Sequence, residues 1–130
     1  MIIGVPKEIK NNEFRVGLTP ESVKILIEDN HELLIEEKAG IGSGFIDRDY
    51  LEVGARIIES PEIIFQQSDL IVKVKEPQLR ETKLLKPNQI LFTYLHLASS
   101  KDLTIQLLNS NCISLAYETI TDDDKNLPLL

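Results

Sequence analysis

The sequence predicts an α/β fold built on a parallel, doubly wound sheet of the flavodoxin or Rossmann-like type, with short helices. Short apolar runs rich in β-branched residues, such as residues 69–74 and 89–94, predict buried strands. Helix-capping residues open the segments between such runs, as in Ser60-Pro61-Glu62. Because strands and helices alternate along the chain, the strands should run parallel and be connected by helices.

Two strands and one helix make up the first part of the chain. Residues 1–5 form the first predicted strand, and a polar loop over residues 7–17 follows it. Thr19 is an expected N-cap with proline at the next position, and apolar residues share one face of a helix that ends at Asp29-Asn30. Residues 32–37 form the second strand, which is apolar on both faces, as a buried parallel strand requires.

The same alternation continues through the rest of the chain. We expect residues 1–130 to form a single domain, because a chain of this length is large enough for one core but not for two. The further expected elements are a helical turn at 47–54, a strand at 55–58, a helix at 60–67, a strand at 69–74, a helical turn at 81–85, a strand at 89–94, a helix from Ser99 or Ser100 through Leu107, and a strand at 112–118.

The last four residues, Leu127-Pro128-Leu129-Leu130, are apolar and follow a polar turn. A tail of this kind would be solvated at a free terminus. We interpret it as part of a chain that once continued, so that the sheet lacks the C-terminal segment that would complete it. A tail that packs locally against the domain is the alternative.

The composition excludes several classes of partner. The net charge is -7, which argues against nucleic acid and anionic membranes. No apolar run approaches the roughly 20 residues that a membrane-spanning helix needs, and no signal peptide precedes the first strand. The single cysteine, Cys112, lies in an apolar run, so we expect it to be buried, unreactive and consistent with the cytoplasm. With one cysteine and two isolated histidines, no metal site is expected.

The glycines at Gly40, Gly42 and Gly44 suggest a dinucleotide-binding loop, but the details do not fit. Their spacing is G-x-G-x-G, and no clear long helix opens on the last glycine. No acidic residue follows at the tip of the next strand, where a ribose would need one. We therefore interpret the segment as a flexible surface loop.

Three chemically competent residues follow predicted strands. Lys75 and His96 come just after the runs at 69–74 and 89–94, and Arg15 lies in the loop after the first strand. Ligands of open α/β sheets collect outside the carboxyl ends of the strands. Arginine can bind a carboxylate through two parallel hydrogen bonds, and histidine exchanges protons near neutral pH. The pattern predicts a site for a small carboxylate that also carries a carbonyl or an amine.

Each of these residues also has a purely structural explanation. Arg15 can be a solvated surface arginine, and Lys75 can solvate a strand end, since alternation sends it to the same side as Lys73. The apolar neighbours of His96 are typical of a half-buried histidine. Lys7 and Glu8 can belong to the rim of the same site, although lysine–glutamate pairs are common on surfaces.

Several motifs spread over nearly the whole chain resemble those of one family. They are residues 3–13 (IGVPKEIKNNE), 15–16, 18–20, 39–40, 42–45, 72–77 (VKVKEP), 91–98 (LFTYLHLA) and 116–119 (AYET). With these motifs the chain resembles the N-terminal part of the alanine dehydrogenase family, which includes the α-subunit of proton-translocating nicotinamide nucleotide transhydrogenase. The transhydrogenase relatives generally lack the equivalents of Lys75 and His96, which favours the alanine dehydrogenase branch.

This resemblance implies that Arg15 and Lys75 hold the carboxylate and carbonyl of pyruvate and that His96 is the catalytic acid/base group. It implies an NAD-dependent, homo-oligomeric enzyme that converts L-alanine, NAD and water to pyruvate, ammonia and NADH. The family's NAD-binding fingerprint and catalytic aspartate lie in a later domain, outside these 130 residues, so we expect the chain alone to be inactive. The alternative is a degenerate or non-catalytic binding or interaction domain of the same family.

Overall fold

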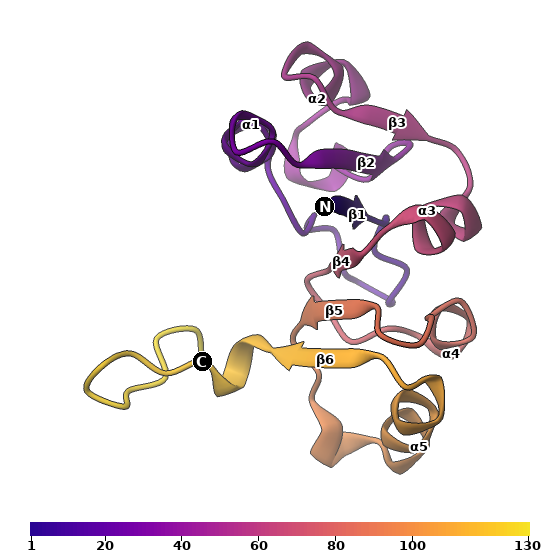
Figure 1. Ribbon diagram of the computed structural model, residues 1–130, viewed down its shortest axis with the longest axis vertical. Helices are drawn as coiled ribbons and strands as arrows, with labels where there is room; N and C mark the ends of the chain where they lie inside the picture. Colours follow the sequence, from indigo (N-terminus) through magenta and orange to yellow (C-terminus); the bar gives the residue numbers. More distant parts are fainter.

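Six parallel strands form one sheet in the computed structural model, which describes all 130 residues (Figure 1). Their order is β3-β2-β1-β4-β5-β6, so β1 and β4 are neighbours at the centre. This arrangement confirms the predicted α/β fold with a parallel, doubly wound sheet. The strands are β1 (Ile2–Val5), β2 (Glu32–Glu36), β3 (Arg56–Ile58), β4 (Leu70–Val72), β5 (Ile90–Thr93) and β6 (Ile113–Ala116).

Helices connect the strands and lie on both faces of the sheet. Val23 of α1 and Tyr50 of α2 belong to the core of one face, and Phe65 of α3 and Leu103 of α5 belong to the core of the other. The α-helices are α1 (Pro20–Glu28), α2 (Asp47–Glu52), α3 (Pro61–Gln67), α4 (Leu79–Thr82) and α5 (Lys101–Ser110), and short 3-10 helices span Ile41–Ser43, Leu97–Ser99 and Tyr117–Thr119. No helix has the length and apolar character that crossing a bilayer would need.

Hydroxyl side chains begin the three longest helices where the sequence predicts it. The side-chain oxygens of Thr19, Ser60 and Ser100 each accept a hydrogen bond from the backbone N–H three residues further on. These bonds satisfy donors that an α-helix leaves free at its N-terminus. The start of each of these helices is therefore encoded locally in the sequence.

The central strands are buried on both sides, so alternate residues enter different cores. Ile3 packs on the side of α1 and α2, whereas Leu34 and Ile71 pack on the side of α3 and α5. Gly4 allows α3 to approach β1 closely, because a Cβ atom at this position would lie 2.3 Å from Ser68 Oγ. This double burial explains why the strands read as continuous apolar runs.

The edge of the sheet at β6 is less covered than its centre. Ile113 and Leu115 are each 48% exposed, because α1 and α2 lie over the other half of the sheet (Figure 1). Cys112, next to this strand, is only partly buried, which corrects the expectation of a fully buried cysteine. The tail after β6 extends away from the sheet, and the Tyr94 hydroxyl donates a hydrogen bond to the Leu129 carbonyl.

Several elements differ from the sequence prediction in their bounds, and three of these differences change the segments around the carboxyl ends of the strands or the start of a helix. Residue 74 was the expected end of the fourth strand, but β4 ends at Val72, and the N–H groups of Val74 and Lys75 donate to the Glu8 carboxylate instead of to a neighbouring strand. The last strand, β6, ends at Ala116, where a 3-10 helix replaces the expected extension to residue 118. The helical turn expected at 81–85 lies earlier, at Leu79–Thr82, since the Glu81 carboxylate accepts the Gln78 N–H at its start.

Candidate active site

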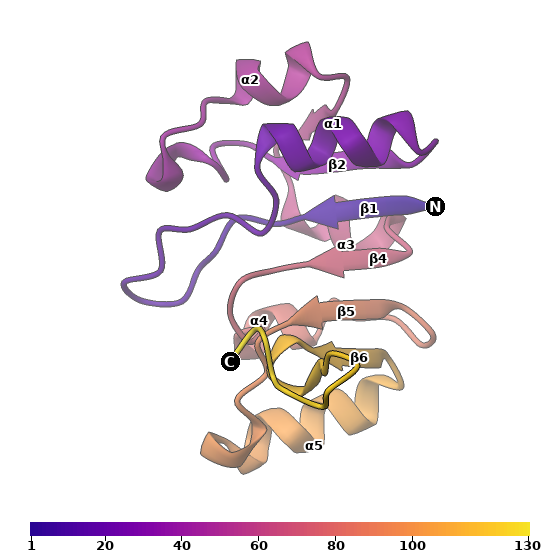
Figure 2. The same ribbon diagram turned by 90° about the vertical axis from the view of Figure 1, so that its left-hand side faces the viewer.

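The three candidate residues lie beyond the carboxyl ends of three neighbouring strands. Arg15 is in the loop after β1, Lys75 follows β4, and His96 follows β5. Figure 2 shows this loop extending past the point where β1 and β4 end. The connections of β1 and β4 leave toward opposite halves of the sheet, which opens a crevice between them.

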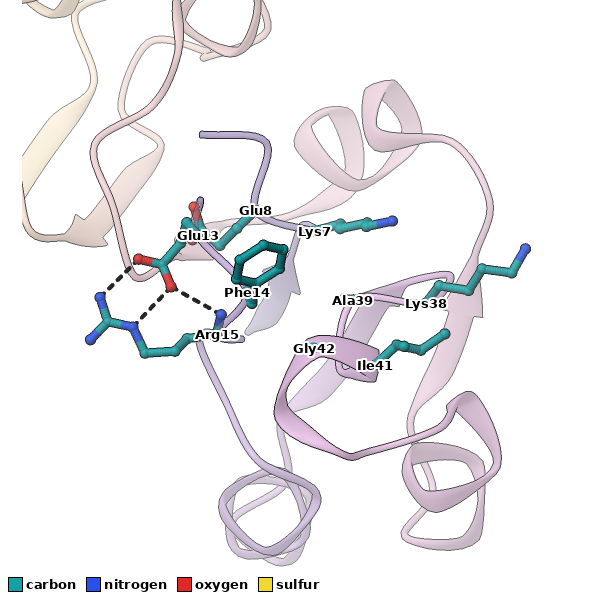
Figure 3. A pocket seen from close by; sticks show the side chains of 9 residues that line it. All are labelled: Lys7, Glu8, Glu13, Phe14, Arg15, Lys38, Ala39, Ile41 and Gly42. Atoms are coloured by element: carbon teal, nitrogen blue, oxygen red, sulfur yellow. Dashed lines mark hydrogen bonds and ion pairs between the residues drawn. The ribbon is translucent and has the colours of Figure 1, made fainter. Parts of the chain in front are cut away.

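Arg15 is held by a neighbouring carboxylate. Its Nε and Nη2 atoms donate to the two oxygens of Glu13 at 2.9 and 2.8 Å, and its backbone N–H donates to the same group at 2.9 Å. Figure 3 shows the guanidinium turned toward Glu13. The hydrogen bonds from Arg15 lower the pKa of Glu13 to about 2, and the same pairing raises the pKa of Arg15. Because Glu13 engages Nε and Nη2, the Nη1 atom remains available to a ligand.

A cavity of about 330 Å³ lies beside this pair (Figure 3). Its lining includes the cations Lys7, Arg15 and Lys38 and the carboxylates of Glu8 and Glu13. In Figure 3 the side chains of Lys7 and Lys38 point away from Arg15. Neither Lys75 nor His96 lines this cavity, so the three candidate residues do not share one preformed pocket.

Tyr94 brings Lys75 and His96 together. The Lys75 ammonium lies 5.9 Å from the centre of the Tyr94 ring, a cation–π distance. The imidazole of His96 stacks on the same ring at 6.0 Å between centroids, with an interplanar angle of 19°. No hydrogen bond or ion pair joins Arg15 to either residue, but the positive charge of Lys75 helps to lower the pKa of Glu13.

His96 is exposed and has an unusual backbone conformation. It adopts φ 47° and ψ 39°, in the left-handed region. The structural alternative of a half-buried histidine does not hold, because the side chain in the loop between β5 and α5 is exposed. An exposed imidazole next to an ammonium and a phenol can exchange protons with a bound molecule.

The sequence gives little warning of a buried charge cluster under the site. Lys73 is fully buried, and its ammonium lies 3.1 Å from Glu8 Oε2 and 2.9 Å from Glu81 Oε1. The strand alternation predicts that Lys73 points to the same side as Lys75, and the sequence predicts Glu8 at the rim of the site or in a surface pair with Lys7. The signal that could have found the cluster is the position of Lys73 inside an otherwise apolar run.

The cluster also fixes the segment that carries Lys75. The Oε1 atom of Glu8 accepts the N–H groups of Val74 and Lys75 at 2.6 and 3.4 Å. Thr93 donates its hydroxyl to the Lys75 carbonyl at 2.8 Å. Burial raises the pKa of Glu8, against the lowering effect of Lys73 and the Val74 N–H. The backbone of Lys75 is thereby anchored on two sides, while its side chain remains partly exposed.

The residues of the glycine-rich loop do not fit a dinucleotide. A Cβ atom on Gly42 would lie 2.2 Å from the Phe14 carbonyl oxygen, so this glycine serves packing against the Arg15 loop. The following helix, α2, begins with Asp47 and Asp49, whose charges would repel a pyrophosphate. Residues 41–44 are exposed, as expected of a surface segment, but Ile41–Ser43 form a short 3-10 helix and Gly40 is buried, so the segment is not an irregular loop.

Comparison with known proteins identifies the family. The model of the family described as "Alanine dehydrogenase/PNT, N-terminal domain" matches residues 4–130. The chain belongs to this family. It is 51% identical to the alanine dehydrogenase of Staphylococcus epidermidis and 48% identical to that of Methanococcus maripaludis, in both cases over all 130 residues and 35% of the relative's length.

Solved structures of this family have the same fold. One of L-alanine dehydrogenase superposes with a TM-score of 0.95 at 49% identity, over 98% of this chain and 35% of the other. A transhydrogenase from Sinorhizobium meliloti superposes with a TM-score of 0.87 at 24% identity, over 95% of this chain and 35% of the other, which shows the fold alone. The chain thus corresponds to the family's N-terminal domain and spans 35% of the length of these relatives.

The ion pair of Glu13 can be tested by its titration. We expect the Glu13 pKa in the folded chain to be about 2, measured by carboxyl ¹³C NMR, because Arg15 stabilises the ionised form. Since this pKa lies below the ordinary value of 4.5, the pair stabilises the fold above pH 4.5, and the contribution is lost as the pH falls toward 2. Arg15→Met should return the Glu13 pKa toward 4.5. Arg48→Met, which removes a separate exposed pair, should leave it unchanged.

Loss of the lysine in the buried cluster, Lys73, should destabilise the fold far more than loss of an exposed lysine. Lys73→Met leaves the carboxylates of Glu8 and Glu81 buried without a cation and should lower the free energy of unfolding by about 3–5 kcal/mol in urea denaturation at neutral pH. The difference in the free energy of unfolding between Lys73→Met and the native chain should shrink at lower pH, because these carboxylates take up protons. Lys83→Met, at an exposed position, should change stability by less than about 0.5 kcal/mol. Equal effects of the two substitutions would refute the importance of the cluster.

Proposed function

We propose that this chain is the substrate-binding part of an NAD-dependent alanine dehydrogenase. The complete reaction would convert L-alanine, NAD and water to pyruvate, ammonia and NADH. The observation that carries the proposal is the position of Arg15, Lys75 and His96 beyond the carboxyl ends of three neighbouring strands, β1, β4 and β5, in a chain of the alanine dehydrogenase/PNT family. A guanidinium can bind the carboxylate of a 2-oxo acid, an ammonium can bind its carbonyl oxygen, and an imidazole can exchange a proton with that oxygen.

Each residue has a separate role in this proposal. Arg15 binds the substrate carboxylate and orients the molecule, with its guanidinium aligned by Glu13. Lys75 stabilises the negative charge that develops on the carbonyl or carbinolamine oxygen. His96 moves a proton to or from that oxygen, and its exposed position on the Tyr94 ring, which Lys75 also approaches, supports this assignment.

The cofactor would be bound by other residues. Because the Gly40–Gly44 segment does not fit a dinucleotide, we propose that NAD binds to a part of the protein outside residues 1–130. The 130 residues alone would then bind pyruvate or alanine weakly and show no turnover. We further propose that the functional protein is a homo-oligomer in the cytoplasm. The free cysteine, Cys112, supports the cytoplasmic location.

A hybrid enzyme provides the test. The N-terminal 35% of the S. epidermidis alanine dehydrogenase would be replaced by this chain, to which it is 51% identical. We expect the hybrid to reduce NAD in the presence of L-alanine, measured by NADH absorbance, while the isolated chain does not. A folded, oligomeric hybrid without turnover would overturn the proposal in favour of a non-catalytic binding domain.

Substitutions in the hybrid should separate the proposed roles. Arg15→Lys keeps the charge but loses the planar fork, so it should mainly raise KM for pyruvate. His96→Ala should lower kcat by about 10²–10⁴-fold and remove a limb of the pH–rate profile near neutrality. His31→Ala is the matched control, since His31 lies at the other end of the sheet beside the N-terminus. A near-normal kcat in His96→Ala would refute the role of His96 as the acid/base group.

A further inference from the structure

His96 needs an external support for its conformation. Its left-handed backbone is uncommon for a residue with a Cβ atom, and no glycine stands nearby to absorb the turn. The strand pairing of β5 ends at Thr93, so the N–H groups of Leu95 and His96 lie outside the sheet. These N–H groups therefore need an acceptor from outside the strand ladder.

The acceptor is the carboxylate of Glu118. Its Oε1 atom accepts the N–H of His96 at 2.8 Å and that of Leu95 at 3.0 Å, and its Oε2 atom accepts the Leu95 N–H at 3.2 Å. Glu118 lies in the 3-10 helix Tyr117–Thr119, which follows β6, the neighbour of β5. Burial would raise the pKa of Glu118, but the N–H groups of His96 and Leu95 outweigh it and lower the pKa, so the group is charged at neutral pH.

The same arrangement occurs at the adjacent strand. The carboxylate of Glu8 accepts the N–H groups of Val74 and Lys75, as that of Glu118 accepts those of Leu95 and His96. In both cases a carboxylate from a distant segment binds two consecutive backbone N–H groups, and the second belongs to the candidate site residue. Glu8 is also committed to the buried Lys73, whereas Glu118 forms no ion pair.

We propose that Glu118 is a positioning residue that holds His96 in its left-handed conformation and thereby keeps the imidazole stacked on the Tyr94 ring, the ring that also lies at a cation–π distance from Lys75. The proposal rests on the proposed role of His96 in catalysis. A purely structural role for Glu118, in which it only ties the segment after β6 to β5, predicts a loss of stability without a selective effect on kcat. The two roles are separated by measuring backbone conformation and kinetics independently.

The first arm uses NMR on the 130-residue chain. In the native chain, His96 should show the strong intraresidue amide-to-Hα NOE of a positive φ, and the Leu95 and His96 amide shifts should follow the titration of Glu118. Glu118→Ala should abolish both signals. Glu118→Gln, which keeps an acceptor oxygen, should retain the NOE. Asp123→Ala removes an exposed carboxylate five residues further on and should change neither. An unchanged His96 NOE in Glu118→Ala would overturn the proposal.

The second arm uses the hybrid enzyme. Glu118→Ala should lower kcat by about 10–100-fold, a loss typical of a displaced catalytic group, while KM for pyruvate stays within about twofold because Arg15 is untouched. Glu118→Gln should recover most of the lost kcat, and Asp123→Ala should match the unmodified hybrid. A normal kcat in Glu118→Ala, or a loss that Glu118→Gln does not recover, would refute positioning. If His96→Ala leaves kcat intact, the proposed function fails, while the NMR arm still decides whether Glu118 holds the backbone.

Discussion

An ammonium enclosed by protein requires carboxylates close by, and Lys73 meets this requirement through Glu8 and Glu81. The three residues come from the end of β4, the loop after β1 and the helix α4. Their attraction therefore ties together the segments that surround the crevice at the centre of the sheet. The segment after β4 also depends on this arrangement, because Glu8 accepts the backbone N–H of Lys75.

The candidate site combines fixed backbones with free side chains. Carboxylates bind the main chain at Lys75 and His96, while the Lys75 ammonium and the His96 imidazole lie 5.9 and 6.0 Å from the centre of the Tyr94 ring. A site built in this way loses little conformational freedom when a ligand arrives, since the loops that carry it are already ordered. Arg15 differs, because Glu13 orders its side chain directly.

Local charge at the site opposes the charge of the whole chain. The net charge of -7 repels anions at long range, so a small carboxylate must be captured at close range. Lys7, Arg15 and Lys38 line the cavity, and Lys75 lies near Glu13. Glu13 offsets part of this positive charge, which leaves room for one further carboxylate on the free edge of the Arg15 guanidinium.

The amino-acid pattern alone determined the fold class, the order of the elements and the three candidate residues. Apolar runs identified every strand of the sheet, and Thr19, Ser60 and Ser100 identified the helix starts, because these signals depend on near neighbours in the chain. The family resemblance added the proposed roles, which periodicity cannot supply.

Only the tertiary structure decided which charges are buried and which backbones are held. Lys73 and Lys75 look alike in the sequence, yet one is enclosed by carboxylates and the other is partly exposed. One partner of Lys73, Glu8, is 65 residues away, and Glu118 is 22 residues from His96. Such pairings depend on strand order, since β4 lies beside β1 and β6 beside β5, and no local pattern encodes that neighbourhood.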